Sequence, residues 1–256
     1  MRSARQFVAD RASPYLARAR VGDRTELFTR AAGPPPPVYG ERWVSRDDVE
    51  YRSFEPGRSK LSAAVVHGWT GPLPAPGERW LYLGAATGTT ASHVGDLVGS
   101  EGRVYAIERS PRPFSRLLGL AGRWTPIRPI LGDARSPRDY GAVVPTVDGL
   151  YADIAQPDQV EIVRQNAELF LAGPGAAVVF ALKTASLGRD RTPADHLAIA
   201  ERSVGADVEL VPSVRLDPFH RGHFLVGGRA RPSLFGQVAP RPVRWTPGRP
   251  RGPRRR

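Results

Sequence analysis

The sequence has 256 residues, a length that suits one domain or one and a half at roughly 100–200 residues per domain. Hydrophobic residues make up 41% of it, which is enough for a buried core. It contains no cysteine, so disulfides, thiolate metal sites and a cysteine nucleophile are excluded. The formal charge is +12, and nine arginines without any acidic residue lie between Arg229 and Arg256. This tail favours a polyanionic partner, with RNA the obvious candidate; a merely solvated basic tail is the alternative.

The sequence shows no signal for secretion or membrane insertion. The first 16 residues include charged side chains and lack the apolar core of a signal peptide. The longest clean apolar run, Ala176 to Leu182, is far shorter than the ~20 residues of a membrane span. We therefore expect a cytoplasmic protein.

The first 50 residues are expected to form a small β domain with a proline-rich spacer. Apolar and polar residues alternate over residues 15–21 and 25–28, and Gly22-Asp23 between them is a turn signal. Pro34 to Pro37 indicate a stiff extended spacer. A second short β stretch is expected over residues 38–51.

From Arg79 onward, apolar strands alternate with helical segments, which predicts a Rossmann-like parallel sheet with helices on both faces. The expected strands are 80–83, 104–107, 127–131, 149–152 and 176–182, and helices are expected to begin at Thr89, Pro111, Pro157 and Thr192. The last two strands, 208–216 and 223–227, are joined by a short Asp217-Pro218 turn and should be antiparallel. We expect this α/β domain to occupy residues 51–229, followed by a disordered Arg/Pro-rich tail over residues 230–256.

A loop of small residues, Gly84 to Gly88, joins the first of these strands to the first helix. Its glycines would let a ligand approach the backbone, and Thr89 and Thr90 would offer hydroxyls and amides at a helix N-terminus. The G-x-x-x-G spacing fits neither a G-x-G-x-x-G dinucleotide loop nor a P-loop, which requires a lysine.

Acidic residues end the next two strands. Glu108 lies 20 residues after Gly88, where an acid can hold two ribose hydroxyls, and Asp133 could accept from an adenine amino group. The two acids therefore predict an adenosine lying across the sheet edge. Two solvated strand-end carboxylates are the alternative.

Only two of the 37 basic residues are lysines, Lys60 and Lys183. They are expected to mark places that need a compact ammonium group, which arginine cannot supply. Their presence by chance is the alternative. Asp153 ends the fourth strand of the repeat and Lys183 ends the fifth, beside the expected cofactor. An ammonium there would stabilise the oxyanion that develops on a ribose 2′-hydroxyl, and a carboxylate would hold the lysine and help remove the proton. A structural ion pair between Asp153 and Lys183 is the alternative.

Four segments of the sequence together resemble fibrillarin, especially its archaeal form. They are YRSFEPGRSKL (51–61), LYLGAATGTTASHVGD (81–96), YADIAQPDQ (151–159) and DPFHRGHFLVGGR (217–229). The similarity runs from about Val38 to Arg229. It implies a class I S-adenosylmethionine-dependent methyltransferase sheet with an antiparallel last strand, preceded by a small N-terminal β domain.

The resemblance also implies roles for individual residues. The family's catalytic set falls on Lys60, Asp153, Lys183 and His223. Cofactor contacts are implied for Thr89, Thr90, Glu108, Arg109, Asp133, Ala134, Asp153, Ile154, Ala155 and Gln156. Two positions depart from the family pattern, because Arg109 stands where an aromatic residue is usual and Gly222 replaces an acidic residue before His223. The five histidines show no metal-ligand spacing, and no metal is expected.

The implied activity is ribose 2′-O-methylation of pre-rRNA and tRNA, guided by box C/D small RNA within a ribonucleoprotein. The implied partners are the guide RNA and its target, a Nop-domain scaffold protein and a kink-turn-binding ribosomal-type protein, in an archaeal cell. Two other functions stay open at this point. One is a non-catalytic assembly subunit of such a particle, and the other is a methyltransferase with a protein substrate.

Overall fold

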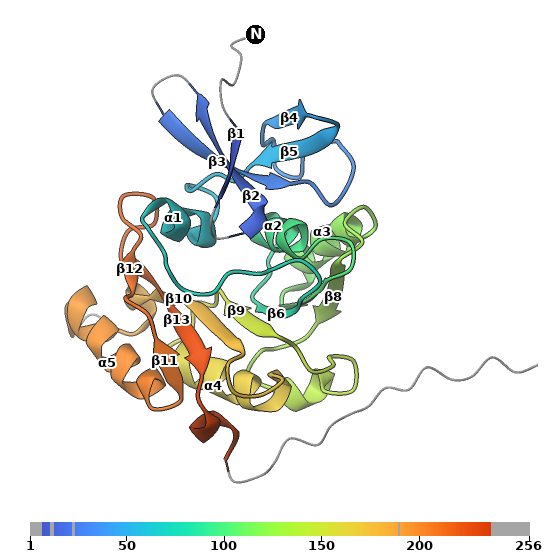
Figure 1. Ribbon diagram of the computed structural model, residues 1–256. Coiled ribbons are helices and arrows are strands. Elements are labelled where there is room, and N and C mark those ends of the chain that lie inside the picture. Colours follow the sequence, from blue (N-terminus) through green and yellow to red (C-terminus); the bar gives the residue numbers. More distant parts are fainter. Residues whose placement is uncertain (1–6, 11–12, 22–23, 189, 237–256) are drawn as a thin grey trace, which may run out of the picture.

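The computed structural model describes residues 7–10, 13–21, 24–188 and 190–236, which form two sheets separated by a layer of helices (Figure 1). The small N-terminal sheet lies at the top of Figure 1. Below it come α1 (Lys60–Val66), α2 (Thr89–Val98) and α3 (Pro111–Ala121), then the large sheet. The other face of the large sheet is covered by α4 (Gln159–Phe170) and α5 (Pro193–Gly205).

The N-terminal sheet is antiparallel, with the strand order β1-β2-β3-β5-β4. Its strands are β1 (Phe7–Asp10), β2 (Ser13–Val21), β3 (Arg24–Arg30), β4 (Trp43–Arg46) and β5 (Val49–Ser53). The small β region expected from the alternating pattern is confirmed, while the Gly22-Asp23 turn lies outside the described residues. The proline segment 34–37 runs through bends and not as a straight extended spacer. The expected domain boundary at residue 50 falls inside β5 and stays a prediction.

The large sheet has the order β11-β13-β10-β9-β6-β7-β8, with β12 paired to β13. Its strands are β6 (Arg79–Leu83), β7 (Arg103–Glu108), β8 (Ile127–Leu131), β9 (Gly149–Ala152), β10 (Ala177–Lys183), β11 (Val208–Leu210), β12 (Val214–Arg215) and β13 (His223–Ala230). Strands β6 to β10 are parallel, and β13 is antiparallel to β10, as predicted. The chain order reverses between β6 and β9, and in open sheets ligands bind outside the carboxyl ends of strands at such a point.

Three elements differ from the expectation. Helix α4 begins at Gln159 and not at Pro157, because Asp158 occupies the N-cap position. The strand expected over residues 208–216 is divided into β11 and β12, and Pro212 lies between them, where it has no N–H to give to the ladder. Helix α1 was not anticipated. The tail expected to be disordered from residue 230 is ordered at its start, since β13 runs to Ala230 and Pro232–Phe235 form a short 3-10 helix. The rest of the expected basic tail, residues 237–256, lies outside the described residues.

The core lies on both faces of the large sheet, which explains why its strands are apolar almost throughout. Alternate residues along a strand point to opposite faces. On β6, Trp80 and Tyr82 belong to the cluster under α1, α2 and α3, and Leu81 and Leu83 belong to the cluster under α4 and α5. No helix in the described part of the chain is both long and apolar enough to cross a membrane.

Candidate active site

The first feature of the site is a close ion pair between Lys60 and Asp153. Lys60 is the first residue of α1, and Ser59 before it caps the helix with its side chain. Asp153 directly follows β9 at the carboxyl edge of the sheet. The Lys60 Nζ lies 2.8 Å from Oδ1 and 2.7 Å from Oδ2 of Asp153, and the two side chains are 19% and 23% exposed. The pair is therefore held in a fixed geometry yet reachable from solvent.

Lys183, the second lysine, is the last residue of β10, the strand next to β9. The parallel register aligns Ala152 with Phe180, so Lys183 lies three residues past that rung while Asp153 lies one past it. Its backbone is fixed by the buried Gln159, whose Oε1 accepts from the Lys183 N–H at 3.2 Å. In the described part of the chain Lys183 forms no ion pair within 4.0 Å, so the alternative of a structural Asp153–Lys183 pair is wrong, and Asp153 pairs with Lys60.

Two histidines lie beside the ion pair. His223 is aligned with Lys183 in the antiparallel register of β10 and β13, and its ring centroid is 6.1 Å from that of His220. The His220 Nε2 is 2.8 Å from the Pro56 carbonyl, four residues before Lys60. Burial lowers the pKa of both histidines, and the charge of Lys60 lowers them further. Both rings are therefore neutral at pH 7.

The loop from Gly84 to Gly88 wraps around the ends of β6 and β7. The N–H groups of Gly84 and Ala85 both donate to the Ile107 carbonyl at 3.0 Å. Gly84 has φ +79°, and a Cβ there would lie 2.5 Å from the Asp153 carbonyl oxygen, so only glycine fits. Gly88 is the N-cap of α2 and leaves its first turn without a side-chain cap. The loop thus brings free helix N–H groups to the switch point.

Glu108, the last residue of β7, is buried and supports this loop. Its Oε2 accepts from the Ala86 N–H at 2.9 Å, and its Oε1 accepts from the Ser110 N–H at 2.7 Å. Each carboxylate oxygen has two lone pairs, so both can accept one further hydrogen bond. The carboxylate can therefore hold two ligand hydroxyls while it shapes the loop.

Asp133 lies beyond the end of β8, next to Glu108 along the sheet edge. Arg135 Nη2 is 2.8 Å from Asp133 Oδ2, and Arg109 Nη1 is 3.8 Å from the same oxygen. The hydrogen bonds from Arg135 lower the pKa of Asp133 below its usual value, so the carboxylate stays ionised. Ala134 is buried, and its carbonyl accepts from Asn166 Nδ2 at 2.8 Å. The segment is thereby fastened to α4.

The turn from Asp153 to Gln156 closes the site on the side of β9. Ile154 packs close to Gly84, since a Cβ on that glycine would lie 2.9 Å from Ile154 Cγ2. Ala155 is exposed, and the Gln156 carbonyl accepts from the Gln159 N–H at 3.2 Å. The turn therefore leads directly into α4 and lies against the Gly84–Gly88 loop.

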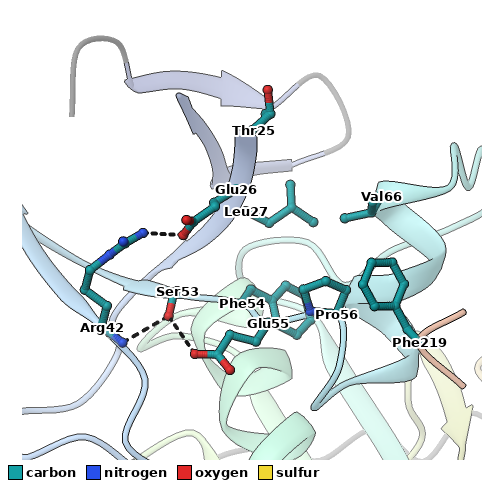
Figure 2. A pocket seen from close by; sticks show the side chains of 10 residues that line it. All are labelled: Thr25, Glu26, Leu27, Arg42, Ser53, Phe54, Glu55, Pro56, Val66 and Phe219. Atoms are coloured by element: carbon teal, nitrogen blue, oxygen red, sulfur yellow. Dashed lines mark hydrogen bonds and ion pairs between the residues drawn. The ribbon is translucent and has the colours of Figure 1, made fainter. Parts of the chain in front are cut away.

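A separate cavity of about 430 Å³ lies behind the segment that leads to Lys60 (Figure 2). Figure 2 shows Leu27 of β3, Val66 of α1 and Phe219 turned toward it. Pro56, whose carbonyl accepts from His220, also lines it. No residue of the Gly84–Gly88 loop lines this cavity, so it is distinct from the group of residues at the switch point.

The structure brings most of the expected site residues to one edge of the sheet. The expected cofactor residues follow the carboxyl ends of β6, β7, β8 and β9; they are the Gly84–Gly88 loop, Thr89, Thr90, Glu108, Arg109, Asp133, Ala134 and the 153–156 turn. Lys183 lies at the end of β10, and His223 lies at the start of β13. Sequence reasoning missed three supporting residues, which are Ser59, Gln159 and His220. All three lie inside motifs described above, Ser59 in 51–61, Gln159 in 151–159 and His220 in 217–229. For Ser59 and Gln159, a polar residue at a helix start was the available signal.

Comparison with known proteins gives one family. The sequence model of the fibrillarin family matches residues 12–232. The chain is 40% identical over 199 residues to the fibrillarin-like rRNA/tRNA 2′-O-methyltransferase of Pyrococcus horikoshii, which covers 78% of this chain and 87% of that protein.

Two solved structures are similar throughout. Aeropyrum pernix fibrillarin in complex with natively bound S-adenosyl-L-methionine has a TM-score of 0.80 at 37% identity, covering 89% of this chain and 99% of that one. A chain of a fibrillarin/Nop5p complex has a TM-score of 0.72 at 38% identity, covering 80% of this chain and 94% of that one.

Proposed function

Because the chain belongs to the fibrillarin family, we propose that it is an S-adenosylmethionine-dependent RNA ribose 2′-O-methyltransferase that acts on rRNA and tRNA. The observation that supports this best is the Lys60–Asp153 pair at the sheet edge, with Lys183 one strand away. This arrangement suits a reaction that activates a hydroxyl next to a bound nucleoside cofactor. An assembly subunit without turnover would need neither lysine.

The polar groups at the switch point suit S-adenosylmethionine. Glu108 retains acceptor capacity for two ribose hydroxyls, and the ionised Asp133 can accept from the adenine amino group. The uncapped first turn of α2 at Thr89 and Thr90 offers N–H groups to the carboxylate of the methionine part. Arg109, where an aromatic is usual, can lie over the adenine with its planar guanidinium. When bound, the cofactor supplies an electrophilic methyl group on a sulfonium.

The residues of this chain then act on the target ribose. Asp153 would accept the proton of the 2′-hydroxyl when the cofactor gives its methyl group to that oxygen and its sulfonium becomes a neutral thioether. A carboxylate is a far weaker base than an alkoxide, so the proton would leave only as the new O–C bond forms. The ammonium groups of Lys60 and Lys183 stabilise the negative charge that develops on the oxygen. His223 lies next to Lys183 in the sheet and, being neutral at pH 7, adds no charge to the site.

The partners follow from the same family. The fibrillarin/Nop5p complex supports a Nop-domain scaffold protein as a partner of this chain. We propose further that a box C/D guide RNA selects the target and that a kink-turn-binding protein completes the particle. These two partners and the expected cytoplasmic location stay predictions.

The proposal is tested by calorimetric titration with S-adenosylmethionine, followed by reconstitution with guide RNA, scaffold protein and target RNA. Binding in the micromolar range, weakened by Asp133→Ala, is expected, together with methylation of the 2′-oxygen opposite the guide. Transfer to a protein of the particle, and not to RNA, would replace the RNA substrate with a protein. Cofactor binding without any transfer would favour the assembly role.

A further inference from the structure

A second cavity, of about 570 Å³, opens beside the Gly84–Gly88 loop on the side of α3. Three arginines line it, Arg58, Arg116 and Arg123, and we refer to it as the arginine cavity. Thr87 and Thr89 add hydroxyl groups, and no acidic residue lines it. The cavity is therefore strongly positive and rich in hydrogen-bond donors.

The three guanidinium groups come from separate segments that the fold brings together. Arg58 lies just before α1, Arg116 lies on α3, and Arg123 follows the end of α3. Arg116 and Arg123 are seven residues apart, a spacing that places both on the same side of a helix and its continuation. The two threonines come from the loop that leads into α2, whose N-terminus adds partial positive charge.

These charges have no counter-charge within the described part of the chain. None of the three arginines forms an ion pair there, and the groups that Arg58 and Arg123 contact are neutral. Arg58 lies over the Tyr39 ring at 5.8 Å, and Arg123 Nη1 donates to the Pro36 carbonyl at 2.8 Å. Arg109 and Arg135, on the cofactor side of the loop, lie instead beside the Asp133 carboxylate. An uncompensated cluster of this kind favours an anionic ligand.

The cavity is connected to the catalytic ion pair through a very short stretch of chain. Arg58 precedes Lys60 by two residues, so their Cα atoms lie within about 7 Å of each other. Ser59 between them accepts from Thr90 Oγ1 at 3.1 Å, which fixes this stretch to α2. An anion in the cavity therefore lies close to any substrate that reaches Lys60 and Asp153.

We propose that the arginine cavity binds the phosphodiester backbone of the RNA strand that carries the target ribose, next to the reacting nucleotide. The identity of the anion rests on the proposed function, while the positive cavity itself does not. Guanidinium groups bind phosphate oxygens through paired hydrogen bonds and read no base. Such contacts suit an enzyme whose target is chosen by a separate guide, because they position any sequence equally well.

The test measures binding of a fluorescently labelled single-stranded RNA to the full chain by anisotropy at several salt concentrations. The variants are Arg116→Gln and the triple variant R58Q/R116Q/R123Q. Arg202→Gln is the matched control, since Arg202 is exposed on α5, on the opposite face of the sheet. The slope of log Kobs against log salt should become less steep by about 0.7 for each phosphate that is no longer neutralised, or by about 2 for the triple variant. The control should keep the parent's slope.

Two results would overturn the proposal in distinguishable ways. If the parent binds RNA and the triple variant keeps its affinity and slope, the cavity has no role in RNA binding and the proposed function stands. If the parent binds S-adenosylmethionine in calorimetry but binds no RNA at any salt concentration, the RNA substrate fails together with the cavity. Retained S-adenosylmethionine affinity in the triple variant serves as the check that it is folded.

Discussion

Arg52 of β5 donates from Nε to Oδ2 of Asp96 on α2 at 2.6 Å, and both side chains are completely buried. The same guanidinium donates to Glu41 at 2.9 Å and to Ser92 at 2.7 Å. Asp96 also accepts from Trp124 Nε1 at 2.9 Å. These bonds join the N-terminal sheet to the helix that follows the Gly84–Gly88 loop, so the two sheets are held together by charge as well as by apolar contact.

Replacing Arg52 with leucine should lower the free energy of unfolding by about 3–5 kcal/mol, because Glu41 and Asp96 would be left buried without a cation. Urea denaturation followed by circular dichroism measures the loss. Arg42→Leu is the control, since Arg42 pairs with Glu26 at the surface and such pairs contribute about 1 kcal/mol or less. Equal losses for the two variants would show that the buried network is not a special source of stability.

Replacing Lys183 with alanine should reduce single-turnover methyl transfer by about 10²–10³-fold, the range for loss of one group that stabilises a developing oxyanion. The affinity for S-adenosylmethionine should stay within a few-fold, because Lys183 is not among the residues proposed to hold the cofactor. Lys183→Arg keeps the charge but not the compact ammonium, and should recover only part of the rate. Full activity of Lys183→Ala would exclude the proposed role.

Glu108→Gln should weaken S-adenosylmethionine binding by roughly 10- to 150-fold, which corresponds to the 1.5–3 kcal/mol of a hydrogen bond to a charged group. The amide of glutamine also brings an NH₂ toward the Ala86 or Ser110 N–H, where only an acceptor fits. Calorimetry provides the measurement. Glu101→Gln, at an exposed turn, is the matched control and should bind like the parent. Unchanged affinity in Glu108→Gln would place the ribose elsewhere.

The buried imidazole of His93 predicts a loss of stability in mild acid. Burial lowers the pKa of His93 well below 6.5, and the charge of Arg52 adds to the effect. Below pH 6.5 the unfolded chain therefore binds a proton that the folded chain does not, and stability falls by about 1.4 kcal/mol for each pH unit from this residue. His220 and His223, whose pKa values are also lowered, act in the same direction.

Urea denaturation at pH 7.5, 6.5 and 5.5 checks this dependence. His93→Gln should be less stable than the parent at pH 7.5 and should show a shallower fall toward pH 5.5. A slope identical to that of the parent would mean that His93 is protonated in the folded protein.

The sheet and its edge were predictable because the signals are local. Apolar runs bounded by glycine and proline located the strands, and Glu108, Asp133 and Asp153 end three of them by simple position in the sequence. A parallel order then brings all three to one edge, as observed. The meeting of these three carboxylates at one edge therefore followed from pattern alone, while their role in holding the cofactor stays a prediction.

The partner of Asp153 was not predictable in this way. Lys60 and Asp153 are 93 residues apart, and their contact depends on how α1 packs against β13 and the N-terminal sheet. The α1 segment has seven residues and is apolar after Lys60 except for Ser62, so it shows no helical periodicity. His220 likewise reaches Pro56 only through tertiary packing. Contacts between side chains that are far apart in the sequence cannot be predicted from the spacing of residues within one segment.

Lys60 enters the site from the connection between the two sheets, whereas every residue proposed to hold the cofactor follows β6. One of the three groups proposed to act on the hydroxyl is thus encoded in a stretch of the polypeptide separate from the cofactor site. A gene copy that altered a few codons around Lys60 would lose chemistry while keeping a receptor for S-adenosylmethionine. A change confined to one short helix would in this way leave a protein that binds S-adenosylmethionine without transferring its methyl group.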